Sequence, residues 1–104
     1  MISDEELFRE WQNGSAGALE TLVRRYHAPL VAHLYRVLGD AHLAEDLAQE
    51  TCIRLVRDAR TYHYPRPFRP WLYTIAHHLA MNYREVTSKP RSFQPGMNGD
   101  IETR

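Results

Sequence analysis

Residues 44–57 read Ala-Glu-Asp-Leu-Ala-Gln-Glu-Thr-Cys-Ile-Arg-Leu-Val-Arg, a segment with helical periodicity and with neither proline nor glycine. Asp40 precedes it as an N-cap, so we predict a helix from there to about Ala59. Small and apolar side chains gather on one face of this helix: Ala44, Ala48, Thr51, Cys52, Leu55 and Ala59. Small residues allow close approach between helices. Because helical periodicity dominates the rest of the chain as well, we predict an all-α fold, a compact bundle of three to four helices.

The opposite face of this predicted helix carries charged and amide side chains around Ile53. The polar residues there are Asp46, Gln49, Glu50, Arg57 and Arg60. A solvated charged stripe is the usual explanation of such a face. A β-branched apolar side chain inside a polar ring, however, is typical of the centre of a protein–protein contact. We therefore predict that this face binds a protein.

Two further helices are predicted before this segment. A capping box that begins at Ser3 indicates a short first helix, which ends at Asn13-Gly14. Ser15 then caps a long second helix, which Gly39 closes. Pro29 lies inside the second helix, and we expect it either to kink the helix or to divide it in two.

After a loop with two prolines at residues 60–67, a fourth helix is predicted from Phe68 to about Val86. Its apolar stripe predicts a core face made of Phe68, Leu72, Ile75, Leu79, Tyr83 and Val86. The opposite face carries Tyr73, His77, Met81 and Arg84. Three residues lie on the border between the two faces: Trp71, His78 and Asn82.

Aromatic and basic residues alternate in the loop and at the start of this helix: Tyr62, His63, Tyr64, Arg66 and Arg69. This mixture suits single-stranded nucleic acid, because bases stack on rings at about 1–3 kcal/mol each and guanidinium groups bind phosphates. The alternative is that Tyr62 and Trp71 are core aromatics that anchor the loop. Tyr64 and Tyr73 are the better candidates for exposure.

The composition limits the class of protein. The 104 residues form at most one domain of zero net charge, but residues 1–50 hold nine acids and four bases whereas residues 51–91 hold eight bases and two acids. One cysteine permits no internal disulfide, the acidic start is not a signal peptide, and charge interrupts every apolar run. We therefore expect a cytoplasmic protein that does not associate with a membrane. Residues 89–104 read as a flexible linker or tail.

The residues of metal or catalytic chemistry are present without a matching pattern. The candidate metal ligands are His42, His63, His77, His78 and Cys52, yet adjacent helical histidines point about 100° apart. Neither a His-Glu-x-x-His nor a Cys-x-x-Cys motif is found. The acids Glu45, Asp46 and Glu50 lie near a helix start, where the dipole favours them. We expect no metal, no cofactor and no enzymatic activity; a small helical metal or redox enzyme is the rival that rests on these residues.

Two long segments resemble one known family. Residues 44–57 are similar to the polymerase-binding helix of extracytoplasmic-function (ECF) sigma factors. Residues 68–83, Phe-Arg-Pro-Trp-Leu-Tyr-Thr-Ile-Ala-His-His-Leu-Ala-Met-Asn-Tyr, resemble the helix of that family that melts the promoter and reads its −10 element. Residues 18–26 and 38–40 are similar to the preceding helix and turn, so the resemblance covers residues 5–86. It marks residues 1–88 as a sigma-70 region 2 domain.

The resemblance implies a function. The third helix would bind the clamp helices of the largest subunit of RNA polymerase through Asp46, Gln49, Glu50, Arg54 and Arg57, largely the face around Ile53. The loop at 61–67 would capture a base flipped from the non-template −10 strand, and the fourth helix would hold that strand. The set expected at DNA is Tyr62, His63, Tyr64, Arg66, Arg69, Trp71, Tyr73, His77, His78 and Asn82. An anti-sigma factor is a further candidate partner.

The chain departs from the family pattern in three respects. Tyr62-His63-Tyr64 replaces a Phe-Arg-Gly type of turn, and His78 replaces a common asparagine. The helix-turn-helix domain that reads the −35 element is not in the sequence, which indicates an excised domain or a linker cut short after Ser88. The runner-up function is a sigma-like module that binds polymerase or another protein without melting promoters.

Overall fold

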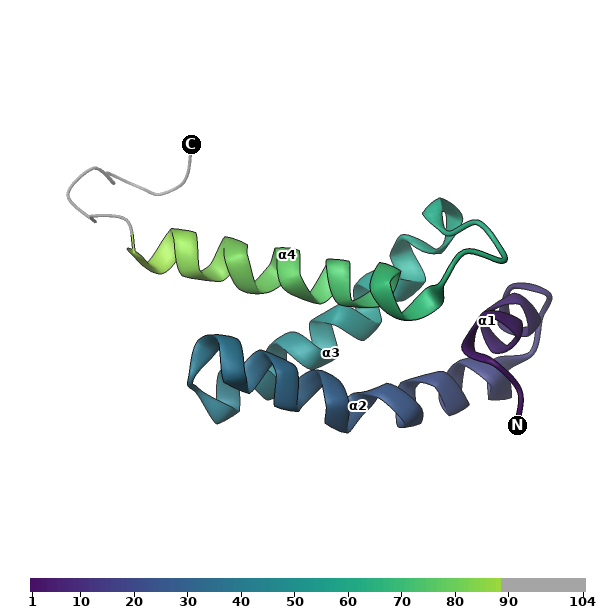
Figure 1. Cartoon of the computed structure of the whole chain (residues 1–104), viewed down its shortest axis with the longest axis horizontal. Helices are drawn as coiled ribbons and strands as arrows, with labels where there is room; N and C mark the ends of the chain where they lie inside the picture. The colour runs from purple at the N-terminus through teal and green to yellow at the C-terminus, as the bar shows by residue number, and fades with distance from the viewer. Residues whose placement is uncertain (89–104) are drawn as a thin grey trace.

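The computed structural model describes residues 1–88, with side chains described as far as Arg84. Within that range the chain forms α1 (Asp4–Gln12), α2 (Ala16–Leu38), α3 (Ala41–Arg57), the short 3₁₀ helix η1 (Ala59–Thr61) and α4 (Phe68–Ser88), with no strand among them (Figure 1). The all-α prediction is confirmed. The tail predicted over residues 89–104 lies outside the described residues.

The helix ends follow local hydrogen bonding. The Ser3 side chain accepts a hydrogen bond of 3.1 Å from the N–H of Glu6, and Asp40 accepts one of 3.0 Å from Leu43. Gly39 ends α2 with a φ of +73°, a left-handed conformation that suits glycine. Ser15 occupies the N-cap position of α2 but its side chain makes no capping hydrogen bond. Of the four predicted caps Ser3, Ser15, Gly39 and Asp40, all but Ser15 therefore make the interaction expected from the sequence.

Pro29 does not divide α2, so of the two alternatives, a kink or a division into two helices, the division is excluded. Buried side chains lie on both sides of the proline along one face of the helix: Ala18, Leu22, Tyr26, Leu30 and Leu34. Packing of these side chains on both sides of Pro29 stabilises α2 as one continuous helix, and the proline itself is exposed. The expected kink at Pro29 stays a prediction.

The predicted core face of α3 is confirmed, and that of α4 is corrected. In α3, Ala44, Ala48, Thr51 and Leu55 are buried and Cys52 is half-buried. In α4 the buried side chains are Phe68, Leu72, Ala76 and Ala80. Ile75 and Leu79 are only half-buried, Tyr83 is exposed, and Val86 lies beyond the described side chains. The prediction used the largest apolar residues and omitted the alanines, whose small side chains let α4 approach its neighbours.

Aromatic rings fill the part of the core where α1, η1 and the start of α4 meet. Phe8 lies at the centre of this cluster, with ring centroids 5.2 Å from Tyr62, 5.1 Å from Phe68 and 5.5 Å from Trp71. Such pairs stabilise beyond the area they bury. Within residues 1–88, every helix is too short or too polar to span a lipid bilayer.

Candidate functional site

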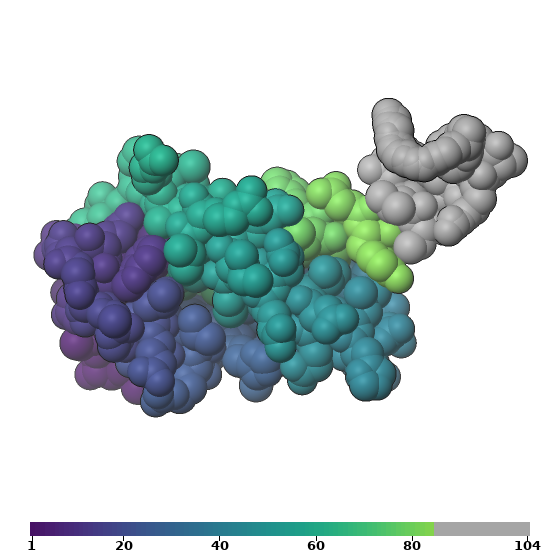
Figure 2. Space-filling model, turned by 180° about the vertical axis from the view of Figure 1, so that it is seen from behind, coloured from purple at the N-terminus to yellow at the C-terminus, as the bar shows by residue number. Residues whose placement is uncertain are grey.

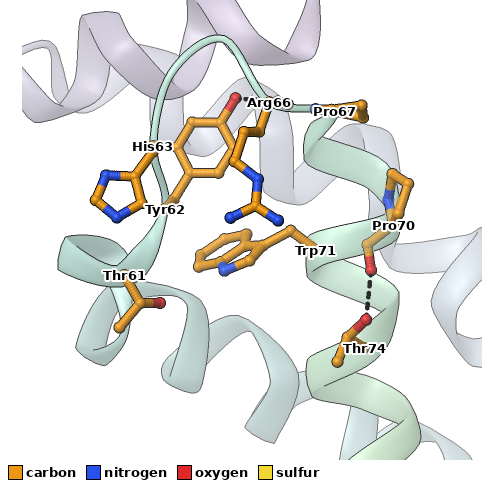
Figure 3. A pocket seen from close by; sticks show the side chains of 8 residues that line it. All are labelled: Thr61, Tyr62, His63, Arg66, Pro67, Pro70, Trp71 and Thr74. Atoms are coloured by element: carbon orange, nitrogen blue, oxygen red, sulfur yellow. Dashed lines mark hydrogen bonds between the residues drawn. The ribbon is translucent and has the colours of Figure 1, made fainter.

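A cavity of about 320 Å³ opens between the segment after α3 and the first turns of α4 (Figure 3). Its walls are Thr61, Tyr62, His63, Arg66, Pro67, Pro70, Trp71 and Thr74. Four of these eight residues belong to the predicted DNA-binding set. Thr74 was missed, although its position three residues after Trp71 places it on the same side of the helix.

Tyr62 forms a structural wall of this cavity. Its side chain is buried, and its hydroxyl donates a hydrogen bond of 2.5 Å to the carbonyl oxygen of Arg66, which closes the loop. Burial raises the pKa of Tyr62, with a smaller contribution from the negative charge of Glu5. Of the two explanations offered by the sequence, anchoring the loop therefore describes Tyr62. Both explanations apply to Trp71. It is half-buried against Tyr62 and Phe68, and it also lines the cavity.

The polar groups of the cavity are mainly donors. His63 and Arg66 are exposed, and Figure 3 shows the guanidinium of Arg66 pointing into the cavity above the indole of Trp71. The lining contains no aspartate, glutamate, asparagine or glutamine. A cavity with aromatic walls and a cation suits a planar ligand that presents hydrogen-bond acceptors or carries a phosphate.

Tyr64 lies outside this lining, at the exposed tip of the loop. The residue is 39% exposed, which confirms the expected accessibility. The guanidinium of Arg9, from α1, lies 4.2 Å from the centroid of the ring. Arg9 was not among the predicted site residues, because the periodicity of α1 carries no information about a loop that comes 55 positions later.

The remaining predicted DNA-binding residues of α4 divide between two faces. His78 and Asn82 are exposed and share by helical spacing the side of Trp71, so they continue the cavity face along α4. Tyr73 turns towards α2 instead, where its half-buried ring lies 5.2 Å from His33 and 6.3 Å from Tyr26. The expected exposure of Tyr73 is therefore corrected.

Arg69 and His77 lie on the α2 side of α4 with Tyr73. The Arg69 guanidinium is 5.4 Å from the Tyr73 ring. Burial lowers the pKa of His33, and the nearby charges of Arg36 and His77 lower it further. The structure thus brings four predicted residues together at the cavity and places three others on a second, basic face.

The exposed face of α3 contains the residues predicted around Ile53 except Arg60, which lies beyond α3 in η1, and it also contains Arg54. We call it the Ile53 face and define it as Asp46, Gln49, Glu50, Ile53, Arg54 and Arg57. Ile53 is 53% exposed, and a 3.3 Å ion pair joins Glu50 to Arg54 beside it. Val56, 44% exposed and one turn further on, was missed although its i+3 spacing from Ile53 predicts the same surface. Figure 2 shows α3 in teal across the back of the molecule, where no other helix covers it.

The residues of possible metal or thiol chemistry do not come together. No group of three His, Cys, Asp or Glu side chains in the described range could hold a metal ion. The rings of His77 and His78 lie 6.4 Å apart at an interplanar angle of 53°. Burial raises the pKa of the Cys52 thiol, which disfavours the reactive thiolate.

Comparison with known proteins shows which family the chain belongs to. The sigma-70 region 2 family matches residues 22–89. RNA polymerase sigma factor YlaC of Bacillus subtilis is 33% identical over 66 residues, 64% of this chain and 38% of that protein. ECF RNA polymerase sigma factor SigW of the same organism is 34% identical over 74 residues, 71% of this chain and 40% of that protein.

A third relative comes from a different group of bacteria. ECF RNA polymerase sigma factor BldN of Streptomyces coelicolor is 35% identical over 79 residues, 75% of this chain and 30% of that protein. The chain therefore spans two-fifths or less of the length of these three relatives. Helical architecture, family match and relatives agree: this chain belongs to the sigma-70 region 2 family and resembles its ECF sigma factors.

Proposed function

We propose that this chain is the part of an ECF sigma factor that binds core RNA polymerase and melts the −10 element of a promoter. The observation that carries the proposal is the presence of two separate exposed surfaces on one small scaffold. The Ile53 face lies on α3, and the aromatic, cationic cavity lies between the loop and α4. One chain can therefore hold a protein and a nucleic acid strand at the same time.

The Ile53 face has the anatomy of a protein interface. Ile53, together with the neighbouring Val56, forms an apolar centre, and the rim of charged and amide side chains is Asp46, Gln49, Glu50, Arg54 and Arg57. An apolar centre loses water on contact, whereas a charged rim selects the partner and its orientation. We assign the clamp helices of the largest polymerase subunit to this face, since the sequence resemblance links the same residues to them.

The cavity has the properties needed to trap an extruded base. Removing a base from its stack costs a few kcal/mol, which a site that stacks and hydrogen-bonds the base can recover. Trp71 offers a ring inside the cavity, Arg66 and His63 offer donors there, and Tyr64 offers a second accessible ring outside it, at the tip of the loop. His78 and Asn82 then extend the same side along α4, where they would follow the separated non-template strand.

Melting of this kind requires binding energy and no chemical step. A captured base lowers the free energy of the open duplex relative to the closed one, so the domain shifts an equilibrium. The function therefore needs no cofactor, and it places the protein with the polymerase in the cytoplasm. An anti-sigma factor would act by covering either surface.

The test compares one labelled oligonucleotide of mixed sequence in single-stranded and duplex form. We expect fluorescence anisotropy to show tighter binding of the single strand, with an affinity that falls steeply as salt is raised. Calorimetry with a clamp-helix fragment of the polymerase should show binding at the Ile53 face. Binding of the fragment without any preference for single-stranded DNA would contradict promoter melting and favour a pure interaction module.

A further inference from the structure

One face of α1 contacts the loop segment from residue 59 to residue 68 at four places. Glu5 accepts a hydrogen bond of 2.7 Å from the N–H of Phe68. Phe8 packs edge-on against the ring of Tyr62, and Gln12 donates a bond of 3.3 Å to the carbonyl oxygen of Ala59. The fourth contact is that of Arg9 with Tyr64. The α1 positions follow the spacing i, i+3, i+4, i+7, so they form one stripe along the helix.

This stripe makes α1 a brace for the loop. Figure 2 shows the purple surface of α1 against the green surface that follows α3. The α1 stripe contacts the start of the segment at Ala59, its middle at Tyr62 and Tyr64, and its end at Phe68. Residues 22–89 match the family, so α1 lies outside the matched segment and no role attaches to it from that match.

The contact of Arg9 with Tyr64 differs from the other three because it holds an exposed side chain. Tyr64 lies in a turn closed by a 2.9 Å hydrogen bond from the N–H of Arg66 to the carbonyl of His63. The guanidinium lies over one face of the ring, and Tyr64 nevertheless stays 39% exposed, so part of the residue remains accessible to a second planar group. An exposed ring held in one orientation loses less conformational entropy when a ligand stacks on it.

We infer that Arg9 is a positioning residue for strand capture: it holds the ring of Tyr64 so that a nucleobase can stack on the face opposite the guanidinium. The inference rests on the proposed function of the loop. It adds a residue of α1 to those that affect DNA binding, and Arg9 acts by orienting Tyr64. The planar guanidinium can stack on the ring and fix its orientation, whereas a lysine ammonium at the same position is a point charge that approaches the ring without stacking on it.

The test is the substitution Arg9→Lys, which keeps the charge and removes the planar group. We expect the affinity for a labelled single-stranded oligonucleotide of mixed sequence to fall by about 2- to 5-fold, the range of an exposed cation–π contact. The slope of log affinity against log salt should not change, because the number of cations is the same. In a Tyr64→Ala background, Arg9→Lys should have no further effect, since its target is absent.

Arg24→Lys is the matched control, because Arg24 is exposed on α2 and paired with Glu20. It should bind DNA like the original chain. Unchanged binding by Arg9→Lys overturns the inference alone, and so does an equal loss in the presence and absence of the Tyr64 ring. If the original chain shows no affinity for single-stranded DNA, the proposed function and this inference both fail.

Discussion

The carboxylate of Glu5 in α1 accepts a hydrogen bond of 2.7 Å from the backbone N–H of Phe68, the first residue of α4, across 63 positions of the chain. The first N–H groups of a helix have no partner within it, so Glu5 caps α4 from a distant helix. Negative charge at this end also interacts favourably with the helix dipole. The contact ties the start of the candidate DNA-binding helix to the first helix of the chain.

We expect Glu5→Ala to lower the free energy of unfolding by about 1 kcal/mol, the usual cost of removing a capping side chain. Urea denaturation followed by circular dichroism measures the change. Glu10→Ala, at an exposed position of the same helix, is the control and should change stability much less. Equal stability of the Glu5 and Glu10 variants would show that the capping contact contributes nothing.

Ile53→Asp should abolish binding to the clamp-helix fragment and leave the fold intact. The side chain is 53% exposed, so little core packing is lost, whereas a charge at the apolar centre of an interface must be desolvated on binding. The measurements are calorimetric titration and the melting temperature. Ala32→Asp, the same kind of change at an exposed position of α2, should bind normally. A melting temperature lower by several degrees in the Ile53 variant alone would place Ile53 in the core.

Tyr64→Ala should weaken binding of single-stranded DNA by about 1–3 kcal/mol, the contribution of one stacked base. The exposed ring has no core role, so the melting temperature should change little. Fluorescence anisotropy with the mixed-sequence strand gives the affinity. An affinity equal to that of the original chain would remove the loop tip from the binding site.

Arg66→Ala should reduce the slope of log affinity against log salt by about 1, as expected for the loss of one phosphate contact. Its guanidinium points into the cavity, where a strand would pass (Figure 3). Arg57→Ala removes the same charge from the Ile53 face on α3 and should leave the slope unchanged. Similar slopes for both variants would mean that the cavity does not contact the phosphates.

Acidification should destabilise the protein through His33. Its pKa in the folded chain is lowered from the ordinary value of 6.5, mainly by burial and further by the charges of Arg36 and His77. As the pH falls through 6.5, the unfolded chain therefore takes up a proton before the folded chain does, and the free energy of unfolding decreases.

The corresponding measurement is the melting temperature between about pH 7.5 and 5.5, the range in which histidines titrate. His33→Gln should make this dependence shallower than in the original chain. His42→Gln, which removes an exposed histidine in the first turn of α3, should not. Parallel curves for the original chain and the His33 variant would contradict the assignment.

The sequence alone predicted the helices and the exposed Ile53. The capping side chains of Ser3 and Asp40 accept hydrogen bonds from residues three positions away, and Gly39 adopts the left-handed backbone conformation that ends α2. These are interactions between near neighbours, so their pattern is visible in the order of residues. The buried face of α3 followed for the same reason, because helical periodicity alone places its small side chains together.

The tertiary structure decided which residues come together at the candidate site. The contacts of Glu5 with Phe68, of Gln12 with Ala59 and of Arg9 with Tyr64 join residues 47 to 63 positions apart, and no periodicity encodes them. The direction in which α4 crosses α2 and α3 also turned Tyr73 inward and buried Ala76 and Ala80. Local hydrogen bonds and side-chain spacing determine each helix separately, whereas the packing of whole helices determines which of their faces meet.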